Sequence, residues 1–399
     1  MERQDIAVAG CGPAGLAAAL LLQRDGHRVT LFERFDTPGP VGSGVMLQPT
    51  GLAVLRSLGL DDEAITTSAR VDRLFGRAAL SGRVVLDVRY RALGLRSGFG
   101  LGVHRAALFD ILHSAAAASG AVIETGRQVV SREPGARPRL IFADGTGAGP
   151  FDLIVDALGA GTTLAAPSGR ALAYGALWAN LDWPEGSELR ADALEQPYHR
   201  ASMMAGVLPI GRSPASTAPQ AALFWSLRQD RLEAWRKTGL QAWKDEACRL
   251  WPATEPLLAQ IDHPDRLTFA RYIHRTIRSP AEPGLAHIGD AWHSASPQLG
   301  QGVNMALLDA YALAKALRDR SELPDALERY VALRRRHVAA YQLMSALFTP
   351  VYQSDSRMLP FVRDQLVGPV SKLWPATIIQ AAMVSGLIGS PLGRLDLAP

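Results

Sequence analysis

The chain contains 399 residues, of which 48% are hydrophobic and 20% charged, and its formal net charge is +4 at pH 7. This length exceeds that of one ordinary domain and the composition fits a soluble protein with a large core, so we expect two closely joined domains. The mild charge, without a Lys/Arg run interleaved with aromatic residues, argues against nucleic-acid binding. Two cysteines cannot form a disulfide framework, and a reducing cytoplasm is the simplest compartment.

The start of the chain carries a complete nucleotide-binding pattern. Residues 5–9 predict a buried strand, the turn Gly10-Cys11-Gly12-Pro13-Ala14-Gly15 follows, and residues 16–22 predict a helix. The first glycine permits a tight turn, the second lets a pyrophosphate approach the backbone, and the third lets helix and strand pack closely. A second strand over 28–32 ends at Glu33, whose carboxylate can accept both hydroxyls of an adenosine ribose. This order of elements predicts a bound dinucleotide.

Helical and strand-like patterns alternate as far as about residue 160. Helical periodicity over 50–58 and 105–118 alternates with strand-like runs over 83–88, 121–124 and 152–156, which predicts an α/β unit. From about 170 to 275, aromatic residues are scattered through strand-like segments. We interpret this aromatic-rich sheet as the substrate domain.

A second motif lies late in the chain. A predicted strand ends at Gly289-Asp290, where a carboxylate can bind the hydroxyls of a ribityl chain, which a flavin has and NAD lacks. The turn Pro297-Gln298-Leu299-Gly300-Gln301-Gly302 then opens onto a helix over 303–310, whose positive N-terminal end would face a bound anion. Asp290 as a simple helix cap is the competing interpretation, but it does not explain the long glycine-flanked turn. The two motifs together predict bound FAD.

The remainder of the chain is mostly helical from Val303 onward. The basic run Arg334-Arg335-Arg336-His337 lies in a helical pattern, and we interpret it as a solvated helix face, with an anion site as the alternative. The apolar run over 376–388 is too short to span a bilayer, so it predicts a buried or dimer-packing helix, or a peripheral membrane contact. The N-terminal apolar run lacks a cleavage pattern, which argues against a secretory signal.

On these motifs the sequence resembles the class A, single-component FAD aromatic hydroxylases, typified by p-hydroxybenzoate hydroxylase and the ubiquinone-biosynthesis hydroxylases. The resemblance covers roughly residues 4 to 345. It rests on both glycine turns, on Glu33 and Arg105, and on the pattern Gly-Asp-x-x-His-x-x-x-Pro-x-x-Gly-Gln-Gly-x-Asn, which residues 289–304 match.

The resemblance implies FAD as cofactor, NADH or NADPH as electron donor, and a set of cofactor contacts. Gln48 would contact the flavin from the loop over 42–49, and Arg105 would pair with the pyrophosphate or ribityl chain unless it only forms a surface salt bridge. The full predicted set is Gly10, Gly12, Pro13, Ala14, Gly15, Glu33, Arg34, Gln48, Arg105, Gly159, Asp290, Pro297, Gly300, Gln301, Gly302, Val303 and Asn304. No metal site is predicted.

One stretch departs from the family pattern. Family members usually carry Asp-Leu-Leu-Val-Gly-Ala-Asp-Gly-x-x-Ser-x-x-Arg, which serves both FAD and NAD(P)H. Here Asp152 and Gly159 keep their places, but Leu158 stands for the second aspartate and Ala165 for the arginine. These side chains can neither accept a ribose hydroxyl nor pair with a phosphate. Drift at a tolerant position and a changed electron source, such as a separate flavin reductase, both explain the departure.

We therefore predict an α/β fold with a Rossmann-like FAD-binding domain (1–70, 101–169 and 276–320), an inserted β-sheet substrate domain (71–100 and 170–275) and a C-terminal helical region (321–399). The predicted activity is hydroxylation or epoxidation of a small aromatic substrate by O2 through a flavin C4a-hydroperoxide, in a cytoplasmic enzyme that could form a homodimer. Candidate catalytic residues are Tyr174, His199 and Pro297, although a structural core role is the favoured interpretation of the first two. The alternatives are a flavin-containing binding protein for a reactive intermediate and a flavin-dependent halogenase, although no Trp-x-Trp-x-Ile-Pro segment is present.

Overall fold

Short runs of fully buried apolar residues build the first sheet of the computed structural model, which describes residues 1–39, 42–95, 98–367 and 373–398. Its strands lie in the order β20 (Ala281–Glu282), β21 (Leu285–His287), β12 (Leu153–Asp156), β1 (Asp5–Ala9), β2 (Arg28–Phe32) and β8 (Val122–Glu124). All neighbours are parallel except β20, which runs antiparallel to β21. The turns after β1, β12 and β21 therefore lie at one edge of the sheet, where ligands of such folds bind.

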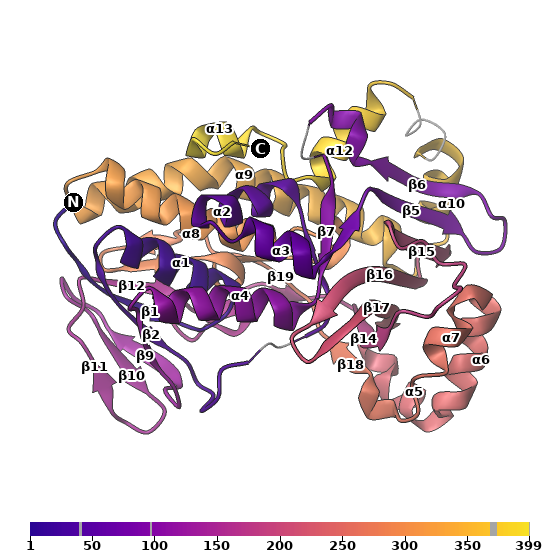
Figure 1. Cartoon of the computed structure of the whole chain (residues 1–399), viewed down its shortest axis with the longest axis horizontal. Coiled ribbons are helices and arrows are strands. Elements are labelled where there is room, and N and C mark those ends of the chain that lie inside the picture. The colour runs from indigo at the N-terminus through magenta and orange to yellow at the C-terminus, as the bar shows by residue number, and fades with distance from the viewer. Residues whose placement is uncertain (40–41, 96–97, 368–372, 399) are drawn as a thin grey trace.

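Different layers cover the two faces of this sheet (Figure 1). Along β1, Ile6 and Val8 pack in the core with the helices α1 (Pro13–Arg24), α4 (Arg105–Ala118), α8 (Gly302–Asp319) and α9 (Leu323–Tyr352). The alternate residues Ala7 and Ala9 pack toward a small sheet of β9 (Val129–Glu133), β10 (Arg139–Phe142) and β11 (Gly147–Ala148). A strand buried on both faces explains why its sequence is apolar throughout.

A second, larger sheet combines two distant segments of the chain. Its order is β18 (Thr268–Ala270), β14 (Tyr174–Asp182), β17 (Ser216–Arg228), β16 (Met203–Ser213), β15 (Ala193–His199), β5 (Arg73–Ala78) and β6 (Val84–Arg89). Trp225 on one face packs with α5 (Leu232–Thr238), α6 (Leu240–Leu250) and α7 (Glu255–Leu258). Phe224 on the other face belongs to a core that also contains Met46 and Val384.

Short strands join the two sheets. β3 (Val45–Leu47), β7 (Gly100–Val103) and β4 (Ala69–Val71) form one three-stranded sheet, and β13 (Arg170–Ala171), β19 (Ile273–Thr276) and β22 (His293–Ser294) form another. A Cβ at Gly102 would lie 1.8 Å from the Pro209 carbonyl oxygen, and one at Gly44 would lie 2.4 Å from Ile210 Cγ2. The larger sheet therefore packs directly on the backbone of β7 and of the loop before β3. The helices α2 (Pro49–Leu58) and α3 (Asp61–Thr67) follow β3.

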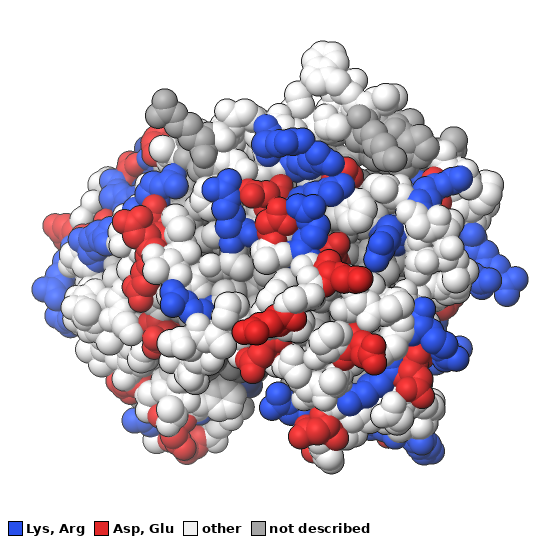
Figure 2. Space-filling model, turned by 45° about the vertical axis from the view of Figure 1, so that its right-hand side comes forward, with Lys and Arg blue, Asp and Glu red and all other residues white. Residues whose placement is uncertain are grey.

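The C-terminal segment packs against the larger sheet and then against the helical layer of the first sheet. It forms α10 (Met358–Val362), α12 (Ala376–Val384) and α13 (Pro391–Leu395), and α12 buries Ala381 and Val384 while Ile379 stays 56% exposed. No helix among the described residues is long and apolar enough to cross a membrane. On the face shown in Figure 2, acidic and basic side chains are intermixed without a continuous basic stripe.

The predicted fold class, a Rossmann-like α/β unit with an inserted β-sheet and C-terminal helices, is confirmed. The residue boundaries given for the domains stay a prediction, and residues 368–372 and 399 of the predicted helical region lie outside the described residues.

Candidate active site

The first glycine turn leaves open space at the start of α1. Gly10 has φ +108°, and a Cβ there would lie 2.5 Å from the Ala157 carbonyl oxygen; a Cβ at Gly15 would lie 1.9 Å from the Gly10 oxygen. A Cβ at Gly12 would meet no atom within 4 Å. Two glycines thus close the contact between β1, α1 and β12, while the third borders the free N–H groups of the helix. This arrangement can receive a phosphate.

Glu33 lies at the end of β2 beside this turn. Its two carboxylate oxygens accept hydrogen bonds from the N–H groups of Cys11 (3.0 Å) and Phe35 (3.1 Å). A carboxylate has further lone pairs, so Glu33 can still accept ribose hydroxyls. Arg34 is exposed and its guanidinium lies 4.5 Å above the Phe35 ring. Burial, with the Glu33 charge, raises the pKa of the Cys11 thiol to about 12, so the thiol stays protonated.

The turn η6 (Gly289–Ala291) follows β21 and presents Asp290 at the sheet edge where the first glycine turn also lies. We call this edge the candidate cofactor site. Gly289 and Ala291 are buried, whereas the Asp290 side chain is exposed, and none of the described residues donates a hydrogen bond to its carboxylate. Although solvent reaches the Asp290 side chain, the protein atoms around it partly desolvate the carboxylate and raise its pKa. His293 and Arg105 partly oppose this rise. An accessible carboxylate without a protein donor can bind hydroxyl groups of a ligand.

Arg105, the first residue of α4, is close enough to both Asp290 and Tyr272 to interact with them electrostatically. Desolvation lowers its pKa, and these two groups raise it. A Cβ at Gly42 would lie 3.3 Å from the Arg105 guanidinium, so the loop before β3 passes over this cation. Arg105 therefore lies under this loop, near Asp290 and Tyr272, and its contact with the cofactor stays a prediction.

Gln48 lies between β3 and α2 and is only 1% exposed. Its N–H donates to Asn304 Oδ1 (2.7 Å) and its Oε1 accepts from the Tyr90 hydroxyl (2.6 Å), but its Nε2 has no acceptor among the described residues. Buried amide groups are nearly always hydrogen-bonded, so this donor is available to an acceptor atom of a ligand. Asn304 Nδ2 donates to the carbonyls of Met46 and Gly300, both at 3.0 Å, and so joins β3 to the start of α8.

The turn before α8 is only partly exposed at the candidate cofactor site. η7 (Pro297–Leu299) leaves Pro297 exposed, and a Cβ at Gly302 would meet no atom within 4 Å. The Gln301 amide instead donates to the Val384 carbonyl, so its side chain holds the C-terminal segment against the turn. Val303 is half-buried in the first turn of α8.

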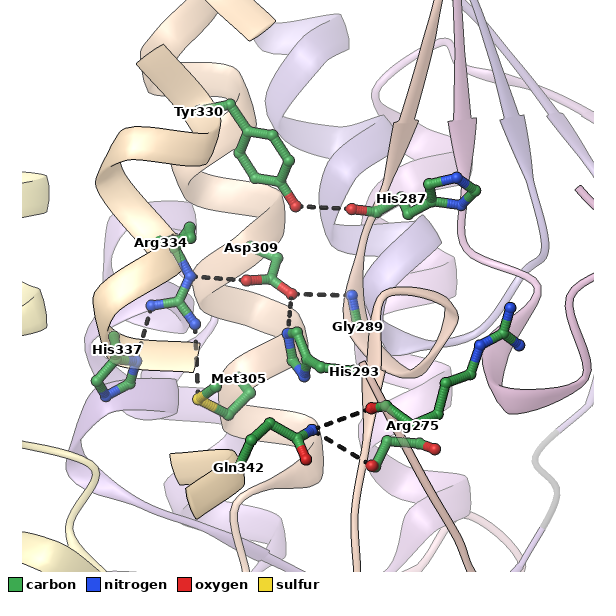
Figure 3. Close-up of polar contacts among 11 residues, drawn as sticks. Arg275, His287, Gly289, His293, Met305, Asp309, Tyr330, Arg334, His337 and Gln342 are labelled. Atoms are coloured by element: carbon green, nitrogen blue, oxygen red, sulfur yellow. Dashed lines mark hydrogen bonds and ion pairs between the residues drawn. The ribbon is translucent and has the colours of Figure 1, made fainter. Parts of the chain in front are cut away.

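A buried ion pair fixes the Gly289–Asp290 turn from behind (Figure 3). Asp309 on α8 accepts from the Gly289 N–H (2.9 Å), from His293 Nε2 (2.7 Å) and from Arg334 Nε of α9 (2.7 Å). Asp309 and Arg334 are both 0% exposed. Burial alone would raise the pKa of Asp309, but His293 and Arg334 hold it below its usual value. The carboxylate is therefore charged and sets the backbone that presents Asp290.

The interpretation of 334–337 as a solvated helix face is wrong for two of the four residues. Arg335 and Arg336 are exposed, but Arg334 and His337 lie three residues apart on the inner face of α9. Arg334 Nη1 donates to His337 Nδ1 (2.9 Å), and His337 Nε2 donates to the Gly386 carbonyl (2.9 Å). Burial, with the Arg334 charge, lowers the pKa of His337 to about 3, so its ring is neutral. This chain of bonds ties the C-terminal segment to the site.

The stretch that departs from the family pattern is held by a different carboxylate. Asp156 is fully buried and accepts from the Leu158 N–H (3.0 Å), the Thr162 hydroxyl (2.6 Å) and His287 Nδ1 (2.6 Å). Gly159, in the turn η2 (Gly159–Gly161), borders open space. The loop after β12 is therefore ordered from inside the protein, although Leu158 and Ala165 offer a ligand no polar group.

The structure does not bring Tyr174 and His199 to the candidate cofactor site. The Tyr174 hydroxyl donates to Asp355 Oδ1 (2.6 Å), and His199 lies at the end of β15 in the hairpin with β16. Neither side chain has a hydrogen bond to the cofactor residues above within the described ranges. Tyr272 was not predicted from the sequence; it follows β18, lies near Arg105, and accepts a hydrogen bond from Trp178 Nε1 (3.0 Å). Its only sequence sign is its place shortly before the Gly289-Asp290 motif.

Residues 3–140 and 220–344 match the family model described as FAD binding domain. The chain belongs to this family. It is 30% identical to kynurenine 3-monooxygenase of Stenotrophomonas maltophilia, over 94% of this chain and 86% of that protein. It is 27% identical to aurachin C monooxygenase/isomerase of Stigmatella aurantiaca, over 92% of this chain and 94% of that protein. The fold is similar to that of Klebsiella pneumoniae HpxO complexed with FAD and uric acid (TM-score 0.79, 21% identity, 98% of each chain).

The family and the geometry agree on the cofactor. The space before Gly12, the free Nε2 of Gln48 and the accessible Asp290 suit the pyrophosphate, ring and ribityl chain of FAD respectively. The enzyme is an FAD-dependent monooxygenase, as its sequence predicts, and this assignment is favoured over a binding protein or a halogenase. Within the described ranges, no group of three or more His, Cys, Asp or Glu side chains is arranged to hold a metal ion.

Proposed function

We propose that this monooxygenase transfers one oxygen atom from O2 to a small aromatic substrate, by hydroxylation or epoxidation, with electrons from NADH or NADPH. The observation that carries the proposal is a set of three features: the exposed Asp290 carboxylate, the buried Gln48 Nε2 without an acceptor among the described residues, and the open glycine turn at Gly12. Two relatives are named as monooxygenases of kynurenine and of aurachin C, and the HpxO structure is complexed with uric acid; all three compounds contain planar rings.

The residues that would hold FAD divide by the part of the cofactor they suit. Gly12 and the start of α1 would bind the pyrophosphate, Glu33 the adenosine ribose, Asp290 the ribityl hydroxyls, and Gln48 Nε2 a ring acceptor. When bound, FAD supplies the activation of oxygen. The positive end of α8 would stabilise negative charge on the reduced ring. Pro297 is proposed to contact the ring edge from the exposed turn before α8.

The substrate ring is proposed to lie against the face of the larger sheet that packs with Met46 of β3. Trp178 and Phe224 on β14 and β17 have ring centroids 4.7 Å apart. The Trp178 indole N–H donates to the Tyr272 oxygen, which leaves the Tyr272 hydroxyl proton available for an oxygen of the substrate. Burial raises the pKa of Tyr272 to about 12, with Trp178 and Arg105 opposing, so this proton stays in place at neutral pH. Tyr272 would therefore orient a substrate oxygen as a donor, rather than remove a proton from it.

The loop before β3 is also connected to the larger sheet, through Asn180 of β14. The Asn180 amide of β14 is hydrogen-bonded to His104 Nε2 (2.9 Å) and to the Ser43 hydroxyl. Burial lowers the pKa of His104, and its Nδ1 accepts from the Ala106 N–H (3.1 Å) at the start of α4. We infer that this contact keeps the loop over the ring site and helps to exclude water.

The electron donor is proposed to act directly, because Asp156 orders the loop after β12 without the usual aspartate and arginine. A separate flavin reductase is the alternative donor. A cytoplasmic location and a homodimer belong to the same proposal, and gel filtration of the purified protein tests the second.

The test is anaerobic mixing of the FAD-loaded protein with NADH or NADPH, with and without a panel of phenols, followed by admission of ¹⁸O2. We expect loss of oxidised flavin absorbance, accelerated by one phenol, and a product that carries one ¹⁸O atom. Reduction by dithionite but by neither nucleotide would move the electron source to a reductase. Reoxidation by O2 without any labelled product, across the panel and with either donor, would contradict oxygen transfer to an aromatic ring.

A further inference from the structure

A cavity lies beside the larger sheet, away from the candidate cofactor site. It has a volume of about 620 Å³ and forms where β14 and β16 begin and β17 ends, beneath α5 and α6 and beside residues 355–357. None of the residues that line it belongs to the proposed FAD or substrate contacts. Its size is that of a pocket for a small organic molecule.

The cavity carries an excess of positive charge. Arg200, Arg228, Arg231 and Arg357 line it, against the acidic residues Glu246 and Asp355. Arg228 is paired with Asp230 (2.7 Å) and with Asp355. Within the described ranges, the other three arginines have no carboxylate within 4 Å. Guanidinium groups of this kind bind planar anions through two parallel hydrogen bonds.

One wall of the same cavity is aromatic. Trp225, Trp243 and Trp235 follow one another in edge-to-face contacts with centroids 6.1 Å apart at each step. Trp243 is only 2% exposed, and the indole N–H groups of Trp235 and Trp243 have no acceptor among the described residues. A buried indole N–H usually has a partner, so these two donors of cavity-lining residues are available to an acceptor.

We infer that this cavity is a second binding site, which takes a one- or two-ring aromatic carboxylate. The ring packs against Trp235, whose side chain is half-buried, and the carboxylate pairs with Arg231 and Arg357. This second binding site does not depend on the proposed oxygenation, because the cavity shares no residue with the proposed FAD and substrate contacts. β14 and β17 run from this cavity to Trp178 and Phe224, so the occupant contacts the strands that carry the proposed substrate face.

Titration calorimetry of the FAD-loaded protein with benzoate, together with flavin absorbance, tests the inference. We expect benzoate to bind with no change in the flavin spectrum, and benzamide, its neutral counterpart, to bind at least tenfold more weakly. Arg231 and Arg357, the two arginines proposed to pair with the carboxylate, are exposed. The double variant Arg231→Ala with Arg357→Ala should therefore fold normally and weaken benzoate binding at least tenfold. Arg236→Ala is the matched control, since Arg236 lies on α5 outside the cavity and pairs with Glu233 at 2.5 Å; benzoate should bind this variant as it binds the parent.

Three results would overturn the inference. Equal benzoate affinity in the double variant and the parent would show that the cavity arginines do not bind the anion. Binding that always perturbs the flavin spectrum would assign benzoate to the active site alone. Tighter binding of phenyl phosphate or inorganic phosphate than of benzoate would assign the cavity to phosphate ligands. Trp235→Leu adds an independent arm, because loss of the ring contact should weaken benzoate but leave inorganic phosphate unchanged.

Discussion

The candidate cofactor site at the first sheet and the proposed substrate face of the larger sheet are built by opposite means. The cofactor site consists largely of backbone turns, and fully buried charges such as Asp309 and Arg334 hold the Gly289–Asp290 turn. The proposed substrate face consists of side chains: Trp178 packs against Phe224 and is hydrogen-bonded to Tyr272. Backbone turns change little when a side chain is replaced, whereas a face made of side chains changes with each substitution. Mutations in the two regions should therefore differ in whether they damage the fold or the specificity.

The largest effect is expected from Asp309→Ala. Removing the carboxylate leaves the Arg334 guanidinium buried without its partner and frees the Gly289 N–H, which should lower the free energy of unfolding by about 3–5 kcal/mol. Urea denaturation of the FAD-free protein measures this loss. Asp192→Ala is the control, because the Arg190–Asp192 pair has the same 2.7 Å distance but is 47% and 48% exposed, and it should cost about 1 kcal/mol or less. Equal losses in the two variants would mean that burial does not distinguish the pairs.

The glycine turn separates fold from cofactor binding within six residues. A Cβ at Gly15 would collide with the Gly10 carbonyl oxygen, so Gly15→Ala should destabilise the FAD-free protein by about 3 kcal/mol. Gly12 has φ −81° and open space around it, so Gly12→Ala should leave that stability within about 0.5 kcal/mol. The same methyl group intrudes where the pyrophosphate is proposed to lie, and FAD should bind about tenfold more weakly. Unchanged FAD affinity in Gly12→Ala would place the pyrophosphate elsewhere.

The buried network also predicts a pH dependence. His337 stays neutral in the folded protein, with a pKa of about 3, whereas in the unfolded chain it binds a proton near pH 6.5. Between these values the unfolded state holds more protons, so the free energy of unfolding should fall by about 1.4 kcal/mol per pH unit as the pH decreases. Denaturation at pH 7.5 and pH 5.5 measures the fall. In His337→Gln the difference between the two pH values should shrink by about half or more; an undiminished difference would assign the effect to other histidines.

The cofactor side of the molecule could be predicted from sequence because its determinants are local. Gly10, Gly12 and Gly15 share one turn, and Glu33 ends the next strand, so their order alone predicts their arrangement. Asp309 and Arg334 could not be predicted in the same way, since they lie on different helices and their pairing depends on how α8 packs against α9. The same limit explains Tyr174, whose type and neighbourhood suited a substrate site but whose hydroxyl is bound to Asp355. Side-chain partners across a sheet depend on tertiary packing, which periodicity does not describe.

The smallest effect, and the sharpest test of the comparison, is expected from two tyrosines, Tyr174 at the start of β14 and Tyr272 just after β18. Tyr272→Phe removes the one hydroxyl proton that is proposed to reach a substrate oxygen, and it leaves the Trp178 indole without its acceptor. A single neutral hydrogen bond is worth about 0.5–1.5 kcal/mol, so kcat/KM for the best phenol should fall by up to about tenfold, with FAD affinity unchanged. Tyr174→Phe is the matched variant, because the Tyr174 hydroxyl donates to Asp355 and is not among the proposed FAD or substrate contacts. If Tyr174→Phe lowers kcat/KM and Tyr272→Phe does not, the substrate lies at the other end of the sheet, and the proposed aromatic face is wrong.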